Sequence, residues 1–257
     1  MTETIAKLER TSQASCNQIC QKQTLEYGIA YYATDFPDAA QLNQYREVIA
    51  GDAERVPSAM DEADTWFAEQ GLRCRRVAMA DGSSPDALST FLESHDYRRQ
   101  TFHALALRSW GDISVDENVR VLPARAMRPA LRATFDDAPT YSTDGPALHA
   151  DIVNERMDDA AYDMHVALVD GKPAGRCGLY QVGDIARLVE CHALPGERQA
   201  AVLESLVAHS LALTTRLSMQ TICVRAWAED SLLLDLYRRA GFEQDGTLYE
   251  FERAASR

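Results

Sequence analysis

The sequence predicts a mixed α/β protein whose second half forms one mixed sheet flanked by helices. Between residues 117 and 253, apolar residues alternate between the two-residue period of strands and the 3.6-residue period of helices. The resulting order is strand, two helices, three strands, helix, strand, helix, strand, an order typical of a sheet covered by helices. With 257 residues, 46% of them hydrophobic, the chain can form one large domain or two smaller ones.

The first half has a looser pattern of helices and short strands. Residues 1–24 are polar and predict a helix, and tyrosines that flank Gly28 predict a strand. Gly71 is typical of the residue just past a helix end. The remaining elements predicted here are a helix at 60–70, a strand at 73–80, a helix at 86–94 and a strand at 97–107.

A domain boundary is expected at 110–117, where Ser109-Trp110-Gly111-Asp112 interrupts the pattern. We therefore expect two domains, 1–112 and 117–257. Asp170-Gly171-Lys172 predicts a hairpin turn. The elements predicted in the second half are strands at 119–122, 162–169, 174–182, 185–194, 221–227 and 247–252, and helices through 127–135 and at 147–157, 199–217 and 230–239.

Composition excludes several classes of function. The net charge is −13 and no basic stripe is visible, so a nucleic-acid binder is not expected. No apolar run approaches the length of a membrane span, and residues 1–22 lack the apolar core of a secretory signal. The six cysteines form no zinc pattern, which predicts reduced thiols, a cytoplasmic protein and no metal site. The acidic surface slightly favours cationic ligands such as amines.

The most informative segment is 236–242, Leu-Tyr-Arg-Arg-Ala-Gly-Phe, where a predicted helix ends and a strand follows. Together with the order of elements over 117–253, this ending resembles the GNAT superfamily of N-acetyltransferases. The resemblance implies a GNAT acyl-CoA N-acyltransferase fold for 117–257, acetyl-CoA as co-substrate, and Tyr237 as the general acid that protonates the leaving thiolate.

The first half contains a weaker echo of the same ending. The predicted strand and the helix 86–94 are followed by His95-Asp96-Tyr97, which parallels Ala240-Gly241-Phe242. Because many α/β proteins share a strand-helix-strand order, two interpretations stay open. The first half is either a degenerate GNAT-like domain, as in tandem members of the family, or an unrelated α/β cap.

The resemblance also implies a cofactor site at the start of the long helix 199–217. The family signature there is Arg/Gln-x-x-Gly-x-Gly/Ala, whose free N–H groups bind the CoA pyrophosphate. Here Ala201 and Leu203 replace the two glycines, so the side chain of Leu203 must either crowd the pyrophosphate or turn into the core. The residues implied in cofactor binding are Ala193, Leu194, Arg198, Gln199, Ala200, Ala201, Val202, Leu203 and Asp230.

Two further residues are candidates for proton transfer from the acceptor. Glu190 lies on the strand 185–194, where some members of the family carry a glutamate, and His192 follows two positions later. Strand alternation would place both on one face, where they could relay a proton or form a structural hydrogen bond.

We therefore expect an N-acetyltransferase that transfers acetyl from acetyl-CoA to a primary amine of a small molecule or peptide. The altered cofactor signature keeps a second interpretation open, a catalytically inactive ligand-binding or interaction protein of the same fold. Acceptor specificity is expected in region 135–160 and in the first half. Exposed strands of such a fold could also pair two subunits in a homodimer.

Overall fold

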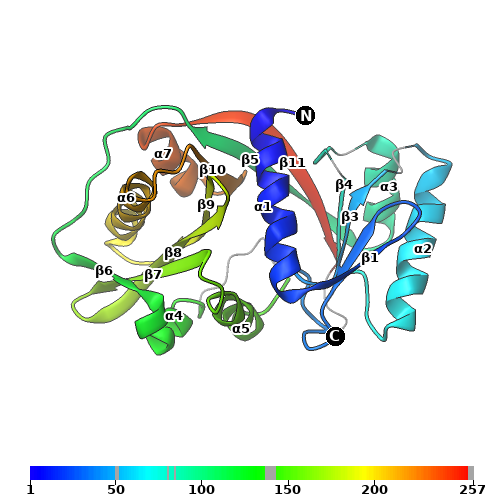
Figure 1. The fold of residues 1–257 in the computed structure, drawn as a ribbon, viewed down its shortest axis with the longest axis horizontal. Coiled ribbons are helices and arrows are strands. Elements are labelled where there is room, and N and C mark those ends of the chain that lie inside the picture. Colours follow the sequence, from blue (N-terminus) through cyan, green and yellow to red (C-terminus); the bar gives the residue numbers. More distant parts are fainter. Residues whose placement is uncertain (50–51, 80, 84, 137–142, 254–257) are drawn as a thin grey trace.

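In the computed structural model, residues 1–49, 52–79, 81–83, 85–136 and 143–253 are described. Their eleven strands form one continuous mixed sheet with the order β1-β2-β3-β4-β11-β5-β10-β9-β8-β7-β6. Figure 1 shows the first half of the chain on the right, the second half on the left, and β5 and β11 running between them.

The first half holds three helices and five strands within the described residues. Its elements are α1 (Glu3–Ile19), β1 (Gln21–Thr24), β2 (Ile29–Tyr32), β3 (Gln44–Val48), α2 (Arg55–Glu69), β4 (Arg76–Met79), α3 (Asp86–Ser94) and β5 (Tyr97–Leu107). The prediction of a helix over 1–24 was too long, because the helix ends at Ile19 and β1 begins at Gln21. The strand β3 was not predicted.

The second half contributes the remaining strands and the longest helix. Its elements are β6 (Val119–Pro123), a 3-10 turn η1 (Ala124–Ala126), α4 (Arg128–Ala133), α5 (Pro146–Arg156), β7 (Tyr162–Val169), β8 (Lys172–Val182), β9 (Ile185–Ala193), α6 (Gln199–Arg216), β10 (Thr221–Trp227), α7 (Ser231–Arg239) and β11 (Phe242–Arg253). The predicted strands 162–169 and 221–227 match these bounds, and the last strand starts five residues earlier than predicted.

The two halves exchange their last strands. β5 belongs to the first half but pairs antiparallel with β10 of the second, and β11 belongs to the second half but pairs antiparallel with β4 of the first. β5 and β11 also pair with each other over nearly their whole length. The expectation that 117–253 forms a complete sheet alone was therefore wrong, since a strand from the first half separates β10 from β11.

The glycine of the sequence motif is required by the turn that starts β11. Gly241 has φ 96°, in the left-handed region, and a Cβ there would lie 1.9 Å from the carbonyl oxygen of Ser109. The corresponding turn before β5 is made by Asp96, which also has positive φ, at 63°. Aspartate tolerates this conformation better than most residues, so the same turn forms twice.

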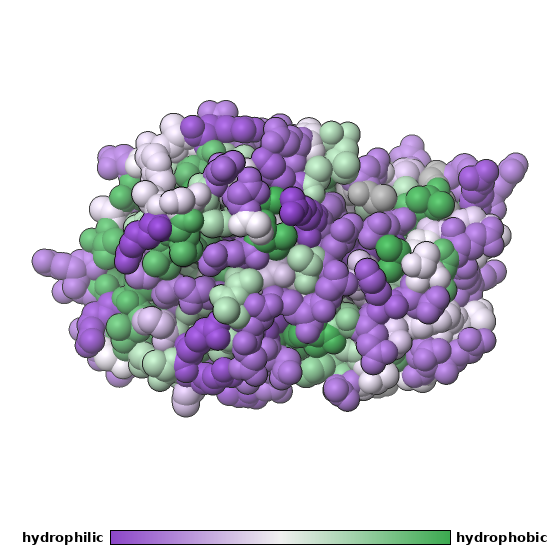
Figure 2. Space-filling model, viewed as in Figure 1, coloured by the Kyte–Doolittle hydropathy of each residue, from purple (hydrophilic) through white to green (hydrophobic). Residues whose placement is uncertain are grey.

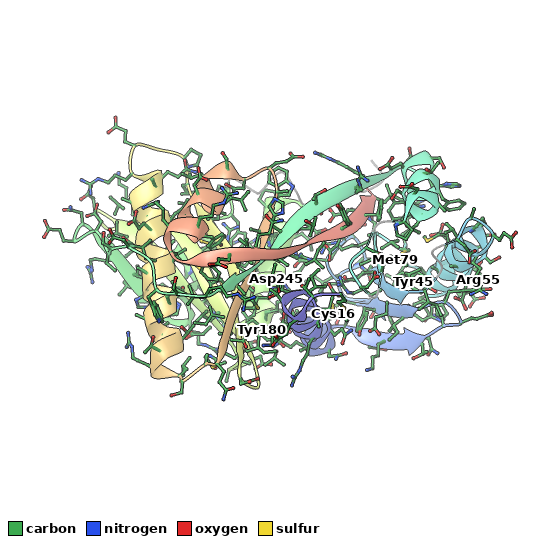
Figure 3. All side chains as sticks on the ribbon, turned by 90° about the horizontal axis from the view of Figure 1, so that it is seen from above. Cys16, Tyr45, Arg55, Met79, Tyr180 and Asp245 are labelled. Atoms are coloured by element: carbon green, nitrogen blue, oxygen red, sulfur yellow. The ribbon has the colours of Figure 1, made fainter. Side chains whose placement is uncertain are left out.

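Helix α1 packs across the middle of the sheet. Its buried side chains include Ile5 and Leu8, which form a small core with residues from β5, β10 and β11. Seen from above, Cys16 of α1 lies between Tyr180 of the second half and Tyr45 of the first (Figure 3). A helix that looks polar in sequence is therefore buried on one side.

The parallel strands β9 and β10 separate partway along their length. Their pairing runs from Ile185 with Thr221 to Leu188 with Val224 and ends there. Beyond that point β9 continues beside β8 and β10 beside β5. The expected splay between the strands 185–194 and 221–227 is thereby confirmed.

Hydrophilic residues cover most of the face shown in Figure 2, and hydrophobic residues appear there in small separate groups. None of the helices in the described part of the chain combines the length and apolar character needed to cross a bilayer.

Candidate functional site

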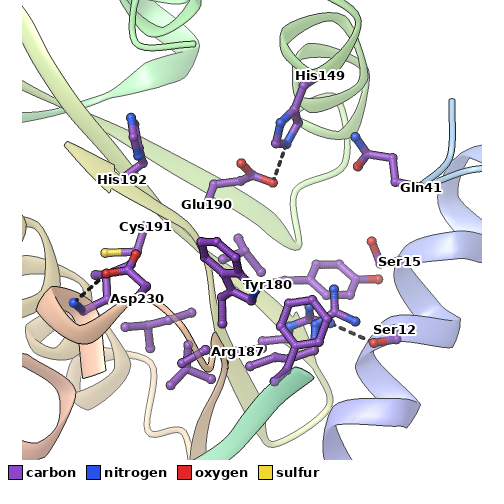
Figure 4. A pocket seen from close by; sticks show the side chains of 18 of the residues that line it. Ser12, Ser15, Gln41, His149, Tyr180, Arg187, Glu190, Cys191, His192 and Asp230 are labelled. Atoms are coloured by element: carbon purple, nitrogen blue, oxygen red, sulfur yellow. Dashed lines mark hydrogen bonds and ion pairs between the residues drawn. The ribbon is translucent and has the colours of Figure 1, made fainter. Parts of the chain in front are cut away.

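A cavity of about 360 Å³ opens where β9 and β10 separate. It receives side chains from both halves of the chain, as Figure 4 shows from close by. The residues that line it are Ser12, Ser15, Cys16, Gln41, Gln44, Arg46, Arg76, Phe102, His149, Arg156, Tyr162, Tyr180, Arg187, Leu188, Val189, Glu190, Cys191, His192, Gln199, Val224, Arg225, Ala226, Trp227, Asp230, Leu233 and Tyr237. All three predicted catalytic residues are among them.

A β-bulge in β9 shapes the wall of this cavity. Val189 pairs with Gly178 and His192 with Arg176, so two residues of β9, Glu190 and Cys191, lie opposite one residue of β8. Glu190 has φ 54°, a conformation that is unusual for a glutamate. Bulges re-aim side chains and are enriched beside active sites. This bulge also interrupts the alternation that led us to expect Glu190 and His192 on one face.

The partner of Glu190 is a histidine from another element. Glu190 Oε1 lies 3.0 Å from His149 Nε2 of α5, and Glu190 Oε2 lies 3.5 Å from Arg176 Nε (Figure 4 shows the first contact). Burial alone would raise the pKa of Glu190, but the charges of His149 and Arg176 and the hydrogen bond to His149 hold that pKa well below its ordinary value. Glu190 is therefore a carboxylate at neutral pH.

Tyr237 lies at the inner end of α7, in contact with the bulge. Its side chain is only 2% exposed and packs edge-on against Phe242, with ring centroids 5.5 Å apart. The hydroxyl hydrogen-bonds with the thiol of Cys191, and burial followed by the neighbouring cysteines raises the pKa of Tyr237 well above its usual value. Tyr237 also belongs to the main core of the second half, so its ring has a packing role besides any role of its hydroxyl.

The start of α6 offers unpaired backbone donors. Within the described residues, no acceptor is found for the N–H groups of Ala200 and Ala201, whereas that of Val202 bonds to Arg198. Gln199 bridges the helix start to β9 by donating to the carbonyl of Ala193 at 3.2 Å. The side chain of Arg198 is exposed beside these amides. A helix N-terminus of this kind attracts anions.

Leu203 does not obstruct this helix start. It is 2% exposed and packs in the core with Val202, one of the two orientations that the sequence allowed. A glycine at 203 would therefore leave a cavity and cost about 2–5 kcal/mol of stability, rather than open the cofactor site. Of the two orientations left open by the sequence, Leu203 therefore adopts the one that turns into the core.

The other residues implied in cofactor binding surround the same region. Ala193 ends β9 and is buried, and the amide of Leu194 bonds to the carbonyl of Ala174. Asp230 caps α7, accepting from the amide of Leu233 at 3.0 Å. It lines the cavity opposite the bulge.

Sequence reasoning missed three residues of the site: His149, Cys191 and Arg187. His149 and Glu190 are 41 positions apart, and no local pattern joins them. Arg187 could have been found from the sequence, because a charged residue inside the apolar run Ile185–Leu188 indicates a buried polar contact. Region 135–160, where we expected acceptor specificity, supplies His149 and Arg156 to the cavity; its residues 137–142 lie outside the described ones.

Comparison with known proteins places the fold. No family model matches the sequence, and no curated protein matches it significantly. Among solved structures, a functionally unknown conserved protein from Staphylococcus epidermidis superposes with a TM-score of 0.72 at 12% identity, covering 92% of this chain and 95% of that one. A GCN5-related N-acetyltransferase from Kribbella flavida gives 0.67 at 14% identity, with 98% and 96% covered.

A third similar structure is a GCN5-related N-acetyltransferase from Sphaerobacter thermophilus, with a TM-score of 0.59, 12% identity, and coverage of 90% and 83%. These superpositions span both halves of the chain. The protein therefore has the fold of the GCN5-related N-acetyltransferases, as its element order and C-terminal motif predicted.

Proposed function

We propose that this protein is an N-acyltransferase that transfers acetyl from acetyl-CoA to a primary amine. One observation carries the proposal: β9 and β10 separate beside the bulge at Glu190, and the cavity between them reaches Gln199 at the start of α6 as well as Tyr237. A thioester that enters from the α6 side would thus reach the bulge. An amine that enters from the side of α1 and α5 would meet it there.

The start of α6 fits the phosphates of CoA. Its two free amides and the helix dipole favour an anion, and Arg198 adds a guanidinium. The two residues that replace the glycines leave these amides in place, since Leu203 turns into the core and Ala201 adds only a methyl group. Glu197 opposes the binding of phosphate but lies on the exposed side of the turn.

Two residues at the bulge are suited to different steps of acyl transfer: Glu190 to holding the amine and Tyr237 to protonating the leaving thiolate. Glu190, held ionised by His149 and Arg176, is suited to accepting a hydrogen bond from the amine. Its lowered pKa makes it a weak base, so the amine must react in its neutral form. Tyr237 keeps its proton throughout the physiological range and can donate it to the leaving thiolate. The thiol of Cys191 lies beside that hydroxyl and shares its hydrogen bond.

The first test is whether the purified chain binds acetyl-CoA and releases CoA thiol when a panel of primary amines is added. We expect binding by calorimetry and thiol release with at least one amine. Binding without release across the panel would favour the non-catalytic ligand-binding alternative. An absence of binding would contradict the proposal.

We also propose that the first half is a degenerate copy of the same fold and that the domains meet near 112–117. Support comes from the repeated strand-helix-strand ending, with positive φ at Asp96 and Gly241, and from bulges at matching places in β3 and β9. No acyl transfer is assigned to the first half.

A further inference from the structure

The end of the cavity farthest from α6 is lined by two arginines that form no ion pair within the part of the chain that the structure describes. Arg187 of β9 and Arg156 of α5 meet Ser12 of α1 and Gln41 there (Figure 4 labels Arg187, Ser12 and Gln41). Neither arginine forms an ion pair with any carboxylate of the described residues. In this they differ from the other arginines that line the cavity, which all form ion pairs.

Those other arginines are compensated. Arg46 pairs with Glu9 at 2.6 Å and with Glu250 at 3.0 Å, Arg76 pairs with Glu252 at 2.6 Å, and Arg225 pairs with Glu250. Three arginines thus face three glutamates. Glu190 is similarly balanced by Arg176. Arg156 and Arg187 form no such ion pair among the described residues, and acidic charges act on them only at longer range, Glu190 on Arg156 and Glu250 and Glu9 on Arg187.

The contacts of the two arginines are with neutral groups. Arg187 donates to Ser12 Oγ at 3.0 Å and to Thr11 Oγ1 at 3.4 Å, and Arg156 donates to Gln41 Oε1 at 3.1 Å. The Nε atoms of both arginines are buried and have no hydrogen-bond partner. Burial, followed by the charge of Arg225, lowers the pKa of Arg187 to about 10, because the longer-range charges of Glu250 and Glu9 do not offset the cost of burying this guanidinium.

The guanidinium groups of Arg156 and Arg187 both affect the pKa values of two neighbouring tyrosines, Tyr162 and Tyr180. Tyr162, Tyr180 and Arg187 are aligned across β7, β8 and β9 by strand register, so their side chains share one face. The charges of Arg156 and Arg187 both lower the pKa of Tyr162 and of Tyr180, against the stronger opposite effect of burial. The hydroxyl of Tyr162 is buried beside Arg156, and no acceptor for its proton is found among the described residues. Unsatisfied donors thus converge from three elements.

We propose that Arg187 and Arg156 bind a carboxylate on the acceptor, so that the acceptor is a small molecule carrying both a primary amine and a carboxylate. This inference rests on the proposed acyl transfer. Glu190 and Arg187 are three residues apart on β9, about 10 Å along a strand, so one small molecule can reach both. The amine faces the bulge at Glu190 and the carboxylate faces the arginines. The overall charge of −13 favours the amine, whereas the arginines favour the acid.

The test compares amino acids with neutral partners of equal length. Glycine, β-alanine, 4-aminobutyrate and 6-aminohexanoate are assayed for thiol release beside the corresponding amino alcohols. We expect at least one amino acid to have a kcat/KM 10-fold or more above its amino alcohol, mostly through KM. Arg187→Gln should raise KM for that amino acid by about 10- to 100-fold, the size of a lost charge-assisted hydrogen bond. KM for the amino alcohol and the Kd of acetyl-CoA should stay unchanged.

Arg120→Gln, at an exposed position on β6, is the control and should change nothing. Arg187 also contacts α1, so its substitution could disturb the packing of that helix. Arg156→Gln is therefore a second variant, and it should lose the preference for amino acids over amino alcohols in the same way. Equal rates for amino acids and amino alcohols in the wild type would overturn the inference. An equal loss on both classes in Arg187→Gln would do the same, because it would indicate a structural role.

The failure of this inference and of acyl transfer can be told apart. Acetyl-CoA binding with turnover of amino alcohols alone would leave the acyltransferase proposal standing and remove the carboxylate subsite. If no amine is turned over, calorimetry with the four amino acids alone tests the subsite directly. Binding in the wild type that is lost in Arg187→Gln would support the subsite, and an absence of binding would overturn it.

Discussion

The two halves of the chain contain the same backbone arrangement with different results. In the second half, β9 carries a bulge at Glu190 with φ 54°, and its parallel pairing with β10 ends before the bulge. In the first half, β3 has a positive φ of 56° at Glu47, and its parallel pairing with β4 resumes beyond it at Val48 and Met79. A bulge alone therefore does not open a cleft; the strands must also separate past it.

The side chains around the two bulges differ accordingly. Tyr237 lies four residues before Gly241, and the residue four before Asp96 is Leu92, which is fully buried in the core of the first half. The helix that follows β9 begins after Arg198, whereas the helix α2 that follows β3 begins after Glu54, whose charge would repel an anion. The first half thus keeps the backbone plan without the groups that the proposed chemistry needs.

The largest effect is expected where the halves are held together. Glu250 on β11 is 2% exposed and contacts Arg46 and Arg76 of the first half and Arg225 of the second. Glu250→Gln would leave these arginines undercompensated, and we expect a loss of about 3–5 kcal/mol in the free energy of unfolding. Chemical denaturation measures this loss.

The control for that experiment is Asp235→Asn, which removes an exposed ion pair with Arg238 and should cost about 1 kcal/mol or less. We expect both variants to unfold in one transition, since the exchanged strands join the halves. Two separated transitions in the wild type would contradict this account, because the two halves would then unfold as independent units.

The next effect concerns the tyrosine that only the second half carries. Tyr237→Phe keeps the ring but removes the proton donor, so turnover should fall by about 10- to 100-fold or more. The lost hydroxyl bond to Cys191 should cost roughly 0.5–1.5 kcal/mol of stability. Thiol-release kinetics and thermal melts measure the two effects.

Tyr249→Phe is the matched control, because Tyr249 is half-buried on β11 and does not line the cavity. It should leave turnover close to the wild-type rate. If Tyr237→Phe and the wild type turned over any active substrate equally fast, Tyr237 would have no role as an acid.

A smaller effect is expected at the start of α6. Ala200→Glu places a carboxylate beside the free amides of the helix and should weaken acetyl-CoA binding by about 10-fold, as expected when a like charge opposes an anion. Ala212→Glu makes the same change at an exposed position of the same helix, about 18 Å further along. It should leave the Kd of acetyl-CoA unchanged. Equal Kd values for the two variants would mean that the phosphates bind elsewhere.

The mildest effect is the response of stability to acid. The pKa values of Glu190 and Glu250 are lowered in the folded chain, so their contribution to stability is complete above the unfolded pKa of about 4.5. We expect the free energy of unfolding to be insensitive to these two groups between pH 7 and pH 5.5. It should fall below pH 4.5, because the unfolded chain takes up protons first. A smaller fall in Glu250→Gln than in the wild type would confirm the assignment, and an equal fall would contradict it.

Much of this fold could be predicted from local sequence patterns. The helix 86–94 and the strands 97–107, 162–169 and 221–227 have the predicted bounds, because each has a clear period and a turn signal at its ends. The exchange of β5 and β11 could not be predicted, since strand pairing depends on contacts between residues more than 100 positions apart. Gln44–Val48 was missed because three of its five residues are polar, two of them buried, so the strand shows no regular apolar alternation.

The candidate site was predictable only in part. Tyr237, Glu190 and Gln199 were identified from the family resemblance and His192 from its spacing to Glu190, and all four line the cavity. The pairing of Glu190 with His149 arises from tertiary packing, and so does the burial of Arg187 without an ion pair among the described residues. The orientation of Leu203 likewise depends on where the core lies.

The central claim is that the chain has one acyl-CoA cleft, located in the second half. Calorimetric titration of the full chain with acetyl-CoA tests it most directly. We predict one binding site per chain, weakened by Ala200→Glu but not by Ala212→Glu. Two sites per chain, or no binding heat and no thermal stabilisation by acetyl-CoA, would contradict the account.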